Sequence, residues 1–478
     1  MSKTDLEAKL EAAGQSHLLR FYDELPKEQQ KQLVDQINVF DMDRVCRVFK
    51  EYAHVKPDDV SKLTPITADH YASVSTQSKD DMDRYWQAGL KAIAHGEVAV
   101  IVLAGGQATR LGADRPKGTL SIGLLRERDS LLDLQAAQIA KLQKIAHTAY
   151  PDQPSIIQWF VMTSMVTSEP TEAHLDTVVL PNEGLDRKNV HYFSQGEMPC
   201  FTVDGKLMLQ DKHRLATSPD GNGGLYRALQ PLLPKMSELG VKYVHVYCVD
   251  NILCRVADPH FIGYCIEKNA DCAAKVVEKI DPFEAVGIVC AVDGVPRVVE
   301  YSEITPELAQ LKDSADPTKL AFRAGNIANH FFTVDFLKNV CSVALPFHPA
   351  HKKIPYVDDS GELINPQKPN GIKMEQFVFD VFLHSKSFYV WEVPRDLEFS
   401  PLKNADVAGK DCAATCRQDL WRVHHHYVKA AGGKVLPEDN PDAEVPFRVE
   451  IDPSLSYAGE DLEPLVSGKT LQSPLSLN

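Results

Sequence analysis

Residues 97–118 read EVAVIVLAGGQATRLGADRPKG, and this stretch decides the fold. A strand-sized apolar run, Val98–Ala104, is followed at once by two glycines, one arginine and a Pro-Lys-Gly. A continuous apolar run of this length is typical of a strand buried on both faces, as in a parallel sheet. In open parallel α/β sheets, ligands bind beyond the carboxyl ends of the strands. The stretch therefore predicts a buried strand that opens into a ligand-binding loop.

The loop has the residue types of a phosphate site. Gly105 and Gly106 leave the strand end without side chains, so that backbone amides can approach anionic oxygens closely. Arg110 and Lys117 add two positive charges, and the planar guanidinium suits the geometry of a phosphate group. A tight turn with surface charges is the alternative for the two glycines alone. The whole pattern favours phosphate binding.

Two common phosphate-binding loops do not fit this stretch. A Walker A loop requires G-x-x-x-x-G-K-[ST], but Gly106 and Gly112 are six positions apart and Ala113 follows them. The dinucleotide fingerprint G-x-G-x-x-G fails at Ala108, which stands where the second glycine is required. The loop is therefore neither that of a P-loop NTPase nor that of a Rossmann dehydrogenase.

The composition of the chain excludes two classes of partner. The chain has 478 residues and a formal net charge of -15, which repels nucleic acid and anionic membranes. No apolar run approaches the ~18 residues of a membrane span. The N-terminus is charged and lacks the apolar core of a signal peptide, and the ten cysteines are scattered. We therefore expect a cytoplasmic protein that binds neither nucleic acid nor membrane.

The periodicity of the chain predicts three domains. Residues 1–96 have a helical pattern and form an N-terminal helical domain. Residues 97–385 alternate apolar strands with helices, which predicts a Rossmann-like, doubly wound α/β domain with a mixed, mostly parallel sheet. Residues 386–478 form a small C-terminal domain that contributes Lys403. Expected elements include helices at 78–95, 130–146, 224–239 and 374–383, and a β-hairpin with its turn at 293–296.

Seven further segments carry a resemblance to a known family. After LAGGQATRLGADRPKG come PDGNGGLYRAL, HVYCVDNIL, NADCAAKVVEK, VVEYSEI, AGNIANHFF, KPNGIKMEQFVFD and EFSPLKNA. In this order they resemble the sugar-nucleotide pyrophosphorylases, and among these the eukaryotic-type UDP-N-acetylglucosamine (UDP-N-acetylhexosamine) pyrophosphorylases. The resemblance runs from about residue 79 to the SYAGEDLE segment of the tail. It implies a nucleotidyltransferase fold of the GT-A-like kind, in a monomer or a homodimer.

The resemblance implies an enzyme that joins UTP and N-acetylglucosamine 1-phosphate, with Mg²⁺ or Mn²⁺, to give UDP-N-acetylglucosamine and pyrophosphate. This reaction is an in-line displacement at the α-phosphorus by an oxygen of the sugar phosphate. Because both reactants are anions, the site needs cations, a metal ion and positioning rather than a covalent nucleophile. Two alternatives stay open. One is a pyrophosphorylase for N-acetylgalactosamine 1-phosphate or glucose 1-phosphate, and the other is a catalytically weak scaffold that binds a UDP-sugar.

The resemblance assigns the charged residues of the site. Arg110 would face the departing pyrophosphate and Lys117 the nucleotide phosphates, with Lys403 as the third catalytic cation. Asp250 ends the apolar strand of HVYCVDN and would bind the metal ion, since Mg²⁺ is a hard ion that prefers oxygen ligands.

The resemblance also implies a set of substrate-binding residues. These are Leu103, Ala104, Gly105, Gly106, Gln195, Gly221, Asn222, Glu300, Tyr301, Asn326 and Lys373. Among them, Gln195 and Gly221 would contact the nucleotide, and Lys373 would face a phosphate. The sugar would be contacted by Asn222, Glu300 and Asn326.

Three positions depart from the family pattern. Ala108 and Leu120 stand where family members usually have a glycine and an aromatic residue, and Ser121 where many carry a polar or acidic residue. The charged residues are all retained, so these departures do not imply a loss of activity; a changed efficiency or sugar preference stays open. We also expect a negative φ at Ala108, because every neighbouring charge is kept. A positive φ would cost alanine roughly 1–2 kcal/mol relative to glycine.

Overall fold

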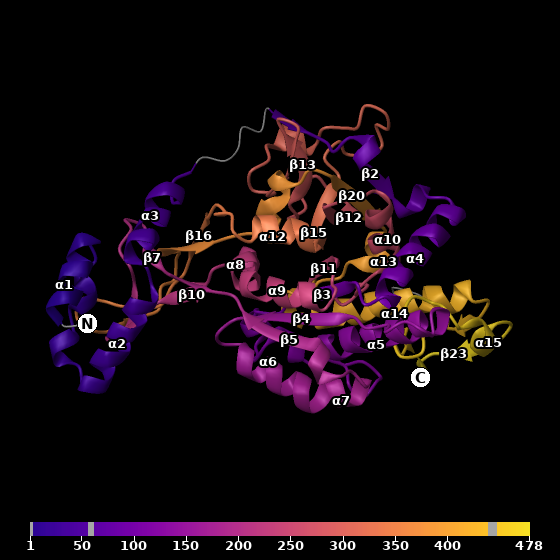
Figure 1. Ribbon diagram of the computed structural model, residues 1–478, viewed down its shortest axis with the longest axis horizontal. Coiled ribbons are helices and arrows are strands. Elements are labelled where there is room, and N and C mark those ends of the chain that lie inside the picture. The colour runs from indigo at the N-terminus through magenta and orange to yellow at the C-terminus, as the bar shows by residue number, and fades with distance from the viewer. Residues whose placement is uncertain (1–2, 56–61, 438–446) are drawn as a thin grey trace. The chain divides into compact units, whose positions relative to one another are not determined.

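The computed structural model describes residues 3–55, 62–437 and 447–478 (Figure 1). The chain forms two compact units, each built from three separate stretches of sequence. Unit 1 consists of Met1–Asp58, Gln195–Ala228 and Val343–Asp380, and unit 2 of Asp59–Ser194, Leu229–Ser342 and Val381–Asn478. No helix in the described ranges is both long and apolar enough to cross a membrane.

Unit 2 is organised around one large sheet with the strand order β2-β20-β12-β15-β11-β3-β4-β5. The strands are β2 (Tyr71–Ser73), β3 (Val98–Leu103), β4 (Gln158–Thr163), β5 (Val190–Ser194), β11 (Tyr243–Cys248), β12 (Cys272–Glu278), β15 (Ala324–Thr333) and β20 (Phe388–Val393). Neighbouring strands in this order are parallel, except that β15 is antiparallel to both β11 and β12. The predicted mixed, mostly parallel sheet is therefore confirmed.

The reversed strand β15 brings its beginning to the edge where its neighbours end. Ala324, its first residue, pairs with Glu278, the last residue of β12. The amino end of β15 and the carboxyl ends of β3, β11 and β12 therefore share one edge of the sheet.

Helices α4 (Lys79–Ala94), α5 (Leu131–Ala149), α10 (Pro259–Glu267) and α14 (Ala413–Ala430) contribute to the apolar core of unit 2. Helices α4 and α10 approach each other at two glycines. A Cβ atom on Gly89 would lie 2.0 Å from the carbonyl oxygen of Pro259, and one on Gly263 would lie 1.8 Å from that of Tyr85. Only residues without a side chain allow the two backbones to come this close.

Two predicted local features of unit 2 are confirmed. Helix α4 begins after Ser78, whose hydroxyl accepts a hydrogen bond from the amide of Asp81. Strands β13 (Ile288–Val292) and β14 (Val295–Val299) form the expected hairpin. Its turn contains Asp293 and Gly294 with φ values of +51° and +78°, as a type I′ turn requires.

Two of the predicted helices differ from the structure. The helix expected at 224–239 is divided into α8 (Leu225–Leu229) and α9 (Leu233–Glu238), because Pro231 and Pro234 lack the amide hydrogen that a continuous helix needs. The helix predicted at 374–383 is wrong in its first part.

Residues Gly371–Glu375 form strand β19, and a 3₁₀-helix follows at Val378–His384. The buried residues of β19 alternate, and its backbone pairs with β16 (His348–Lys352), a partner that lies outside any local sequence window. Strand pairing therefore overrides a local pattern that resembles a helix.

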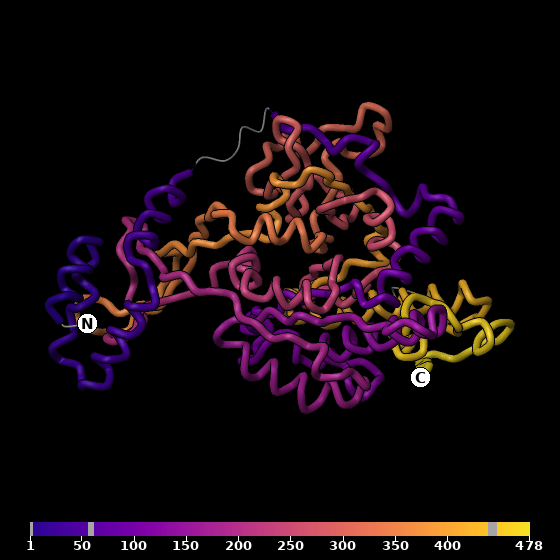
Figure 2. Tube along the Cα trace, viewed as in Figure 1, coloured from indigo at the N-terminus to yellow at the C-terminus, as the bar shows by residue number. Residues whose placement is uncertain are grey.

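Unit 1 packs the N-terminal helices against two later stretches of the chain. Helices α1 (Lys3–Ala12), α2 (Lys27–Val39) and α3 (Met42–Tyr52) share one apolar core with residues of 198–215 and 347–374. In Figure 2 the indigo helices lie beside the magenta and orange segments of this unit. The rings of Phe49 and Phe201, for example, are 4.9 Å apart.

The units differ from the three predicted domains. Residues 59–96 belong to unit 2, because β2 extends the main sheet beside β20 and α4 packs in the same core. Residues 386–478 also belong to unit 2, since β20 is a strand of that sheet. The predicted boundaries at 96 and 385 therefore do not coincide with those of the units.

His330 on β15 is fully buried, and neither ring nitrogen has a hydrogen-bond partner within the described ranges. Burial lowers its pKa from 6.5 to about 3. The folded state therefore binds fewer protons than the unfolded state between these values, so stability falls as the pH falls through that range. We predict that His330→Leu raises the Tm at pH 7 and weakens the decrease in Tm between pH 7 and pH 5, measured by thermal unfolding.

His245 on β11 provides the matched control. It is equally buried, but its Nε2 lies 2.6 Å from Oδ1 of Asn329, and its Nδ1 accepts from the amide of Ala257. His245→Leu should therefore lower the Tm, because it leaves these groups unpaired. A lower Tm for His330→Leu at pH 7 would contradict the prediction.

Candidate functional site

The first strand of the predicted site and the strand of Asp250 end side by side. Strands β3 and β11 are parallel neighbours, with Leu103 paired to Cys248. The amide of Val249 donates to the carbonyl oxygen of Leu103 and extends this pairing by one residue. The loop that starts at Gly105 and the side chain of Asp250 therefore leave the sheet at the same edge, as the sequence predicts.

The loop after β3 is closed by its own backbone. The amide of Ala108 donates to the carbonyl oxygen of Arg115 at 3.0 Å, and the amide of Lys117 donates to that of Gly106 at 3.0 Å. The hydroxyl of Ser164, which follows β4, donates to the carbonyl oxygen of Gly105. These bonds hold Lys117 next to the glycines at the strand end.

Ala108 fits this loop without strain. Its φ is -90°, so the expected negative value is confirmed, and its side chain is buried. The backbone at this position does not require glycine. The methyl group packs into the base of the loop.

Lys117 is brought to Asp250 by the close packing of Gly118. A Cβ atom on Gly118 would lie 2.9 Å from side-chain carbons of Leu132 and Val249. The Nζ atom of Lys117 lies 3.5 Å from Oδ2 of Asp250. This distance is longer than the usual 2.7–2.9 Å of a charge-assisted bond, and Asp250 makes no other side-chain bond within the described part of the chain.

Lys403 reaches the same place from the C-terminal part of unit 2. The amide of Leu402 donates to the carbonyl oxygen of Asp250 at 2.8 Å, and the amide of Lys403 donates to that of Asp411 at 2.7 Å. Burial and the charge of Asp250 raise the pKa of the Cys248 thiol to about 12, while Lys403 and Lys117 act in the opposite direction. The Lys117 ammonium and the Asp250 carboxylate therefore meet at the carboxyl end of β11, and the backbone next to Lys403 is bonded to Asp250.

Arg110 lies on a short 3₁₀-helix, Thr109–Leu111, within the loop after β3. Its side chain is exposed and forms no ion pair within the ranges that the structure describes. An exposed guanidinium without a protein partner can bind an anion at little cost in lost contacts.

Two of the three residues predicted to contact the sugar, Glu300 and Asn326, lie around Gly287 in unit 2. The amide of Asn326, near the start of β15, donates to the carbonyl oxygen of Gly287 at 2.8 Å. A Cβ atom on Gly287 would lie 2.9 Å from a carboxylate oxygen of Glu300. Tyr301 is half exposed beside it, at 50%. The structure thus brings Glu300, Tyr301 and Asn326 together, with Asn326 at the same sheet edge as Gly105 and Asp250.

Four predicted site residues lie in unit 1, namely Gln195, Gly221, Asn222 and Lys373. Gly221 has a φ of +88°, and a Cβ atom on it would lie 2.3 Å from the carbonyl oxygen of Gln376. The side-chain oxygen of Asn222 accepts from the amide of Val378 at 2.9 Å. The DGNGG loop is therefore closely packed, and the Asn222 side chain keeps its amide nitrogen available for a ligand.

Gln195 and Lys373 flank this loop within unit 1. The residue after Gln195, Gly196, accepts from the amide of Asp220 at 3.0 Å, and the amide of Gln376 donates to the carbonyl oxygen of Asp220 at 2.8 Å. Lys373 lies on β19, three residues before Gln376, and is half-buried. Asp220 therefore connects the stretch of Gln195 with the stretch of Lys373.

Sequence reasoning missed Lys279, which directly follows β12 at the site edge. Its side chain is 2% exposed, and its ammonium group has no partner within the described ranges. Burial lowers its pKa. Its spacing from Lys275 in NADCAAKVVEK places both lysines on one face of a strand, and this was the available signal.

A cavity of about 680 Å³ lies beside the site, at the ends of β12 and β20. Its lining includes Glu278, Glu392, Arg395, Lys410 and Asp411, and none of the predicted site residues. It adjoins the site through Asp411, whose carbonyl oxygen accepts from the amide of Lys403, and through Ser400 and Pro401, which lie beside Asn251. The cavity is therefore next to the charged cluster and separate from it.

The family of the chain follows from comparison of its sequence with known proteins. Residues 42–444 match the family described as UTP–glucose-1-phosphate uridylyltransferase. The chain belongs to this family. The resemblance to nucleotidyltransferases that make UDP-sugars is thereby confirmed.

Individual relatives are similar to this chain over nearly its whole length. UDP-N-acetylhexosamine pyrophosphorylase-like protein 1 of Homo sapiens is 44% identical, over 100% of this chain and 97% of the relative. UDP-N-acetylglucosamine pyrophosphorylase of Saccharomyces cerevisiae is 38% identical, over 96% of each chain. The crystal structure of the uridine diphosphate N-acetylglucosamine pyrophosphorylase from Trypanosoma brucei, in complex with inhibitor, is 28% identical with a TM-score of 0.81. It covers 97% of this chain and 95% of that one.

The geometry of Ala108 leads to a prediction about the loop. We expect Ala108→Gly to change kcat/KM by less than about threefold, because the native φ is open to both residues and the charged groups are unchanged. It should also lower the Tm slightly, since glycine gains more freedom in the unfolded chain, worth about 0.5–1 kcal/mol. Steady-state kinetics and thermal unfolding measure both effects. A rise in kcat/KM of more than tenfold would show that the methyl group hinders substrate.

Proposed function

We propose that this chain is a UDP-N-acetylglucosamine pyrophosphorylase, which transfers uridylyl from UTP to N-acetylglucosamine 1-phosphate. The observation that carries the proposal is the placement of Lys117 and Lys403 around Asp250, beside the loop after β3. This arrangement occurs at the carboxyl edge of a mostly parallel sheet, where α/β proteins bind ligands.

The proposed reaction is an in-line displacement at the α-phosphorus, which the charged residues assist. A phosphate oxygen of the sugar phosphate attacks, the bond to the bridging oxygen breaks, and pyrophosphate leaves with the electron pair. Lys117 and Lys403 offset the repulsion between the two anions and stabilise the negative charge that builds up on the equatorial oxygens. Arg110, exposed on the loop, binds the departing pyrophosphate. The backbone amides of Gly105 and Gly106 can approach the phosphates because no side chain intervenes.

The residues also fit a bound Mg²⁺ or Mn²⁺ ion, with Asp250 as the protein ligand. Its carboxylate is 20% exposed, and among the described residues its side chain contacts only Lys117, at 3.5 Å. Within the described ranges no group of three or more His, Cys, Asp or Glu side chains could hold a metal ion. A single carboxylate suits Mg²⁺, which keeps several waters and binds substrate phosphates. When bound, such an ion would neutralise phosphate charge.

The choice of sugar rests on the relatives and on the residues around Gly287. Relatives that align with almost the whole chain are named for N-acetylglucosamine or N-acetylhexosamine, which favours an N-acetylated sugar over glucose. Glu300 and Asn326 supply an acceptor and an amide for the hydroxyl and N-acetyl groups. We propose that Gln195 and Gly221 contact the nucleotide, Asn222 the sugar and Lys373 a phosphate. A cytoplasmic location and a monomeric or homodimeric state remain predictions from the sequence.

The central test is release of pyrophosphate from UTP and N-acetylglucosamine 1-phosphate in the presence of Mg²⁺. We expect Lys117→Ala to lower kcat by about 10²–10³-fold, the usual cost of one preorganised charge contact. Lys188→Ala, at an exposed lysine that pairs with Asp186, is the control and should retain the wild-type rate. A wild-type enzyme that releases no more pyrophosphate than Lys117→Ala would refute the proposed activity. Equal turnover of glucose 1-phosphate would refute the choice of sugar.

A second test addresses the metal ion through binding rather than turnover. In the wild-type protein, Mg²⁺ should increase the affinity for UTP, as measured by isothermal titration calorimetry with and without the ion. Asp250→Asn should remove most of this increase, because the neutral amide binds a hard cation much more weakly. UTP affinity without metal should change little or rise, since Asp250 then no longer repels the phosphates. An Mg²⁺ effect of wild-type size in Asp250→Asn would exclude Asp250 as the ligand.

A further inference from the structure

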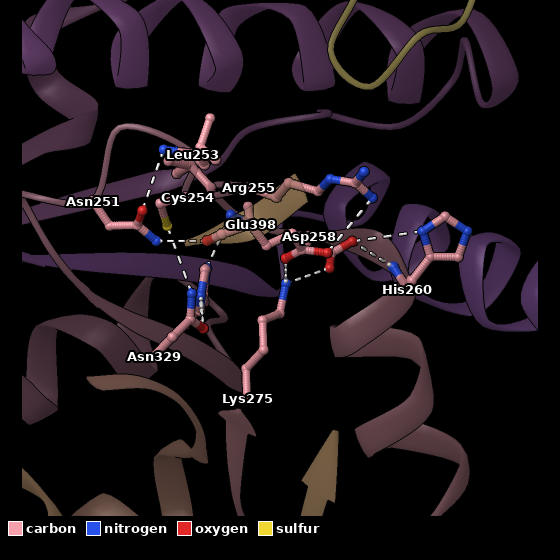
Figure 3. Close-up of polar contacts among 12 residues, drawn as sticks. Asn251, Leu253, Cys254, Arg255, Asp258, His260, Lys275, Asn329 and Glu398 are labelled. Atoms are coloured by element: carbon pink, nitrogen blue, oxygen red, sulfur yellow. Dashed lines mark hydrogen bonds and ion pairs between the residues drawn. The ribbon is translucent and has the colours of Figure 1, made fainter. Parts of the chain in front are cut away.

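Asn251, the residue after Asp250, joins two segments that are far apart in the sequence. Its Oδ1 atom accepts from the amides of Ser400, at 2.9 Å, and Leu253, at 3.3 Å. Its Nδ2 atom donates to the carbonyl oxygen of Glu398 at 2.8 Å. The side chain is 5% exposed, and Figure 3 shows its hydrogen bonds to Leu253 and Glu398. Three of its four hydrogen-bonding positions are therefore used to hold backbone groups.

The same two segments are also joined by their backbones. The amide of Ile252 donates to the carbonyl oxygen of Ser400 at 3.1 Å. The amide of Leu402 donates to the carbonyl oxygen of Asp250 at 2.8 Å, and Lys403 is the next residue. The strap, residues 398–402, therefore runs alongside 250–252, and its position sets where Lys403 leaves the backbone.

The beginning of the strap is anchored by a buried ionic cluster. The Nζ atom of Lys275 lies 2.5 Å from Oε2 of Glu398 and 2.6 Å from Oδ2 of Asp258. These three side chains are 0%, 4% and 2% exposed, and Arg255 lies 3.7 Å from the other oxygen of Glu398. Figure 3 shows Lys275 pointing to both carboxylates. Because breaking a buried charge pair is costly, Glu398 has little freedom to move.

We propose that Asn251 is a positioning residue for uridylyl transfer, acting through the strap on Lys403. Its amide fixes the strap against the end of β11, so that the Lys403 ammonium and the Asp250 carboxylate meet the same phosphates. This inference rests on the roles proposed above for Lys403 and Asp250. A displacement of about 1 Å in such a group can cost about 10²-fold in rate.

A merely structural role for Asn251 would have different consequences. In that case its loss would lower stability and would act on the rate independently of Lys403. A matched control for stability is Asn329 on β15, which is 3% exposed and bonds His245 and the sulfur of Cys254, with no hydrogen bond to the strap. Both side chains are buried amides, so their removal should cost similar stability.

The first measurement compares Asn251→Ala with Asn329→Ala in the full-length protein. We expect both variants to lower the Tm to a similar extent. Only Asn251→Ala should lower kcat by about 10–100-fold, whereas Asn329→Ala should stay within threefold of wild type. Asn251→Asp, which keeps both accepted bonds and loses the donated one, is a second variant should the alanine protein not fold, and it should also lower kcat. A kcat within threefold of wild type for Asn251→Ala, or for Asn251→Asp in its place, overturns the proposal.

The second measurement is a double-mutant cycle with Lys403→Ala. If Asn251 acts through Lys403, adding Asn251→Ala to Lys403→Ala should lower kcat by no more than a further threefold. Losses that multiply overturn the inference while leaving the role of Lys403 intact. A wild-type kcat for Lys403→Ala alone refutes instead the role of Lys403 in the proposed function, and the route through the strap with it.

Discussion

The parallel pairing of β3 with β11 is the interaction on which the site depends. Because Leu103 lies opposite Cys248, the loop after one strand and the carboxylate after the other leave the sheet together. The reversal of β15 then brings Asn326 to the same edge. A shift of one residue in the pairing of β11 would turn its side chains to the opposite faces of the sheet. Asp250 could then no longer lie beside Lys117.

Sequence analysis predicts this edge well because its signals are local. A buried strand, a pair of glycines and an acid at a strand end can each be recognised within ten residues of sequence. The cations Arg110, Lys117 and Lys403 are recognised from the motifs that surround them. The division into units could not be predicted, because it depends on apolar contacts between distant segments, such as Phe49 with Phe201. Likewise, β19 resembles a helix until its partner β16 is known.

The residues that support the site were missed for the same reason. Asn251 reads as a polar residue after a strand, and its role becomes visible only when Ser400 is found beside it. Lys275 lies in an apolar strand, and its carboxylate partners Asp258 and Glu398 are 17 and 123 positions away. The buried cations and those at the edge of the sheet differ in exposure and in their partners. In the interior, Lys275 is paired with two carboxylates at close range, whereas Lys279 is buried without a partner in the described ranges. Arg110 and Lys403 are exposed at the edge of the sheet.

The exposed cations have a further consequence in a chain whose formal net charge is -15. A nucleoside triphosphate that approaches from bulk solution meets, on average, a repulsive field. At physiological ionic strength charges are screened over about 8 Å, so the attraction of Arg110 and Lys403 acts only in the last part of the approach. Added salt therefore affects capture of the nucleotide in two opposite ways: it weakens the distant repulsion and the local attraction together. The entry rate of the nucleotide should then depend on ionic strength less steeply than at a site in a chain of net positive charge.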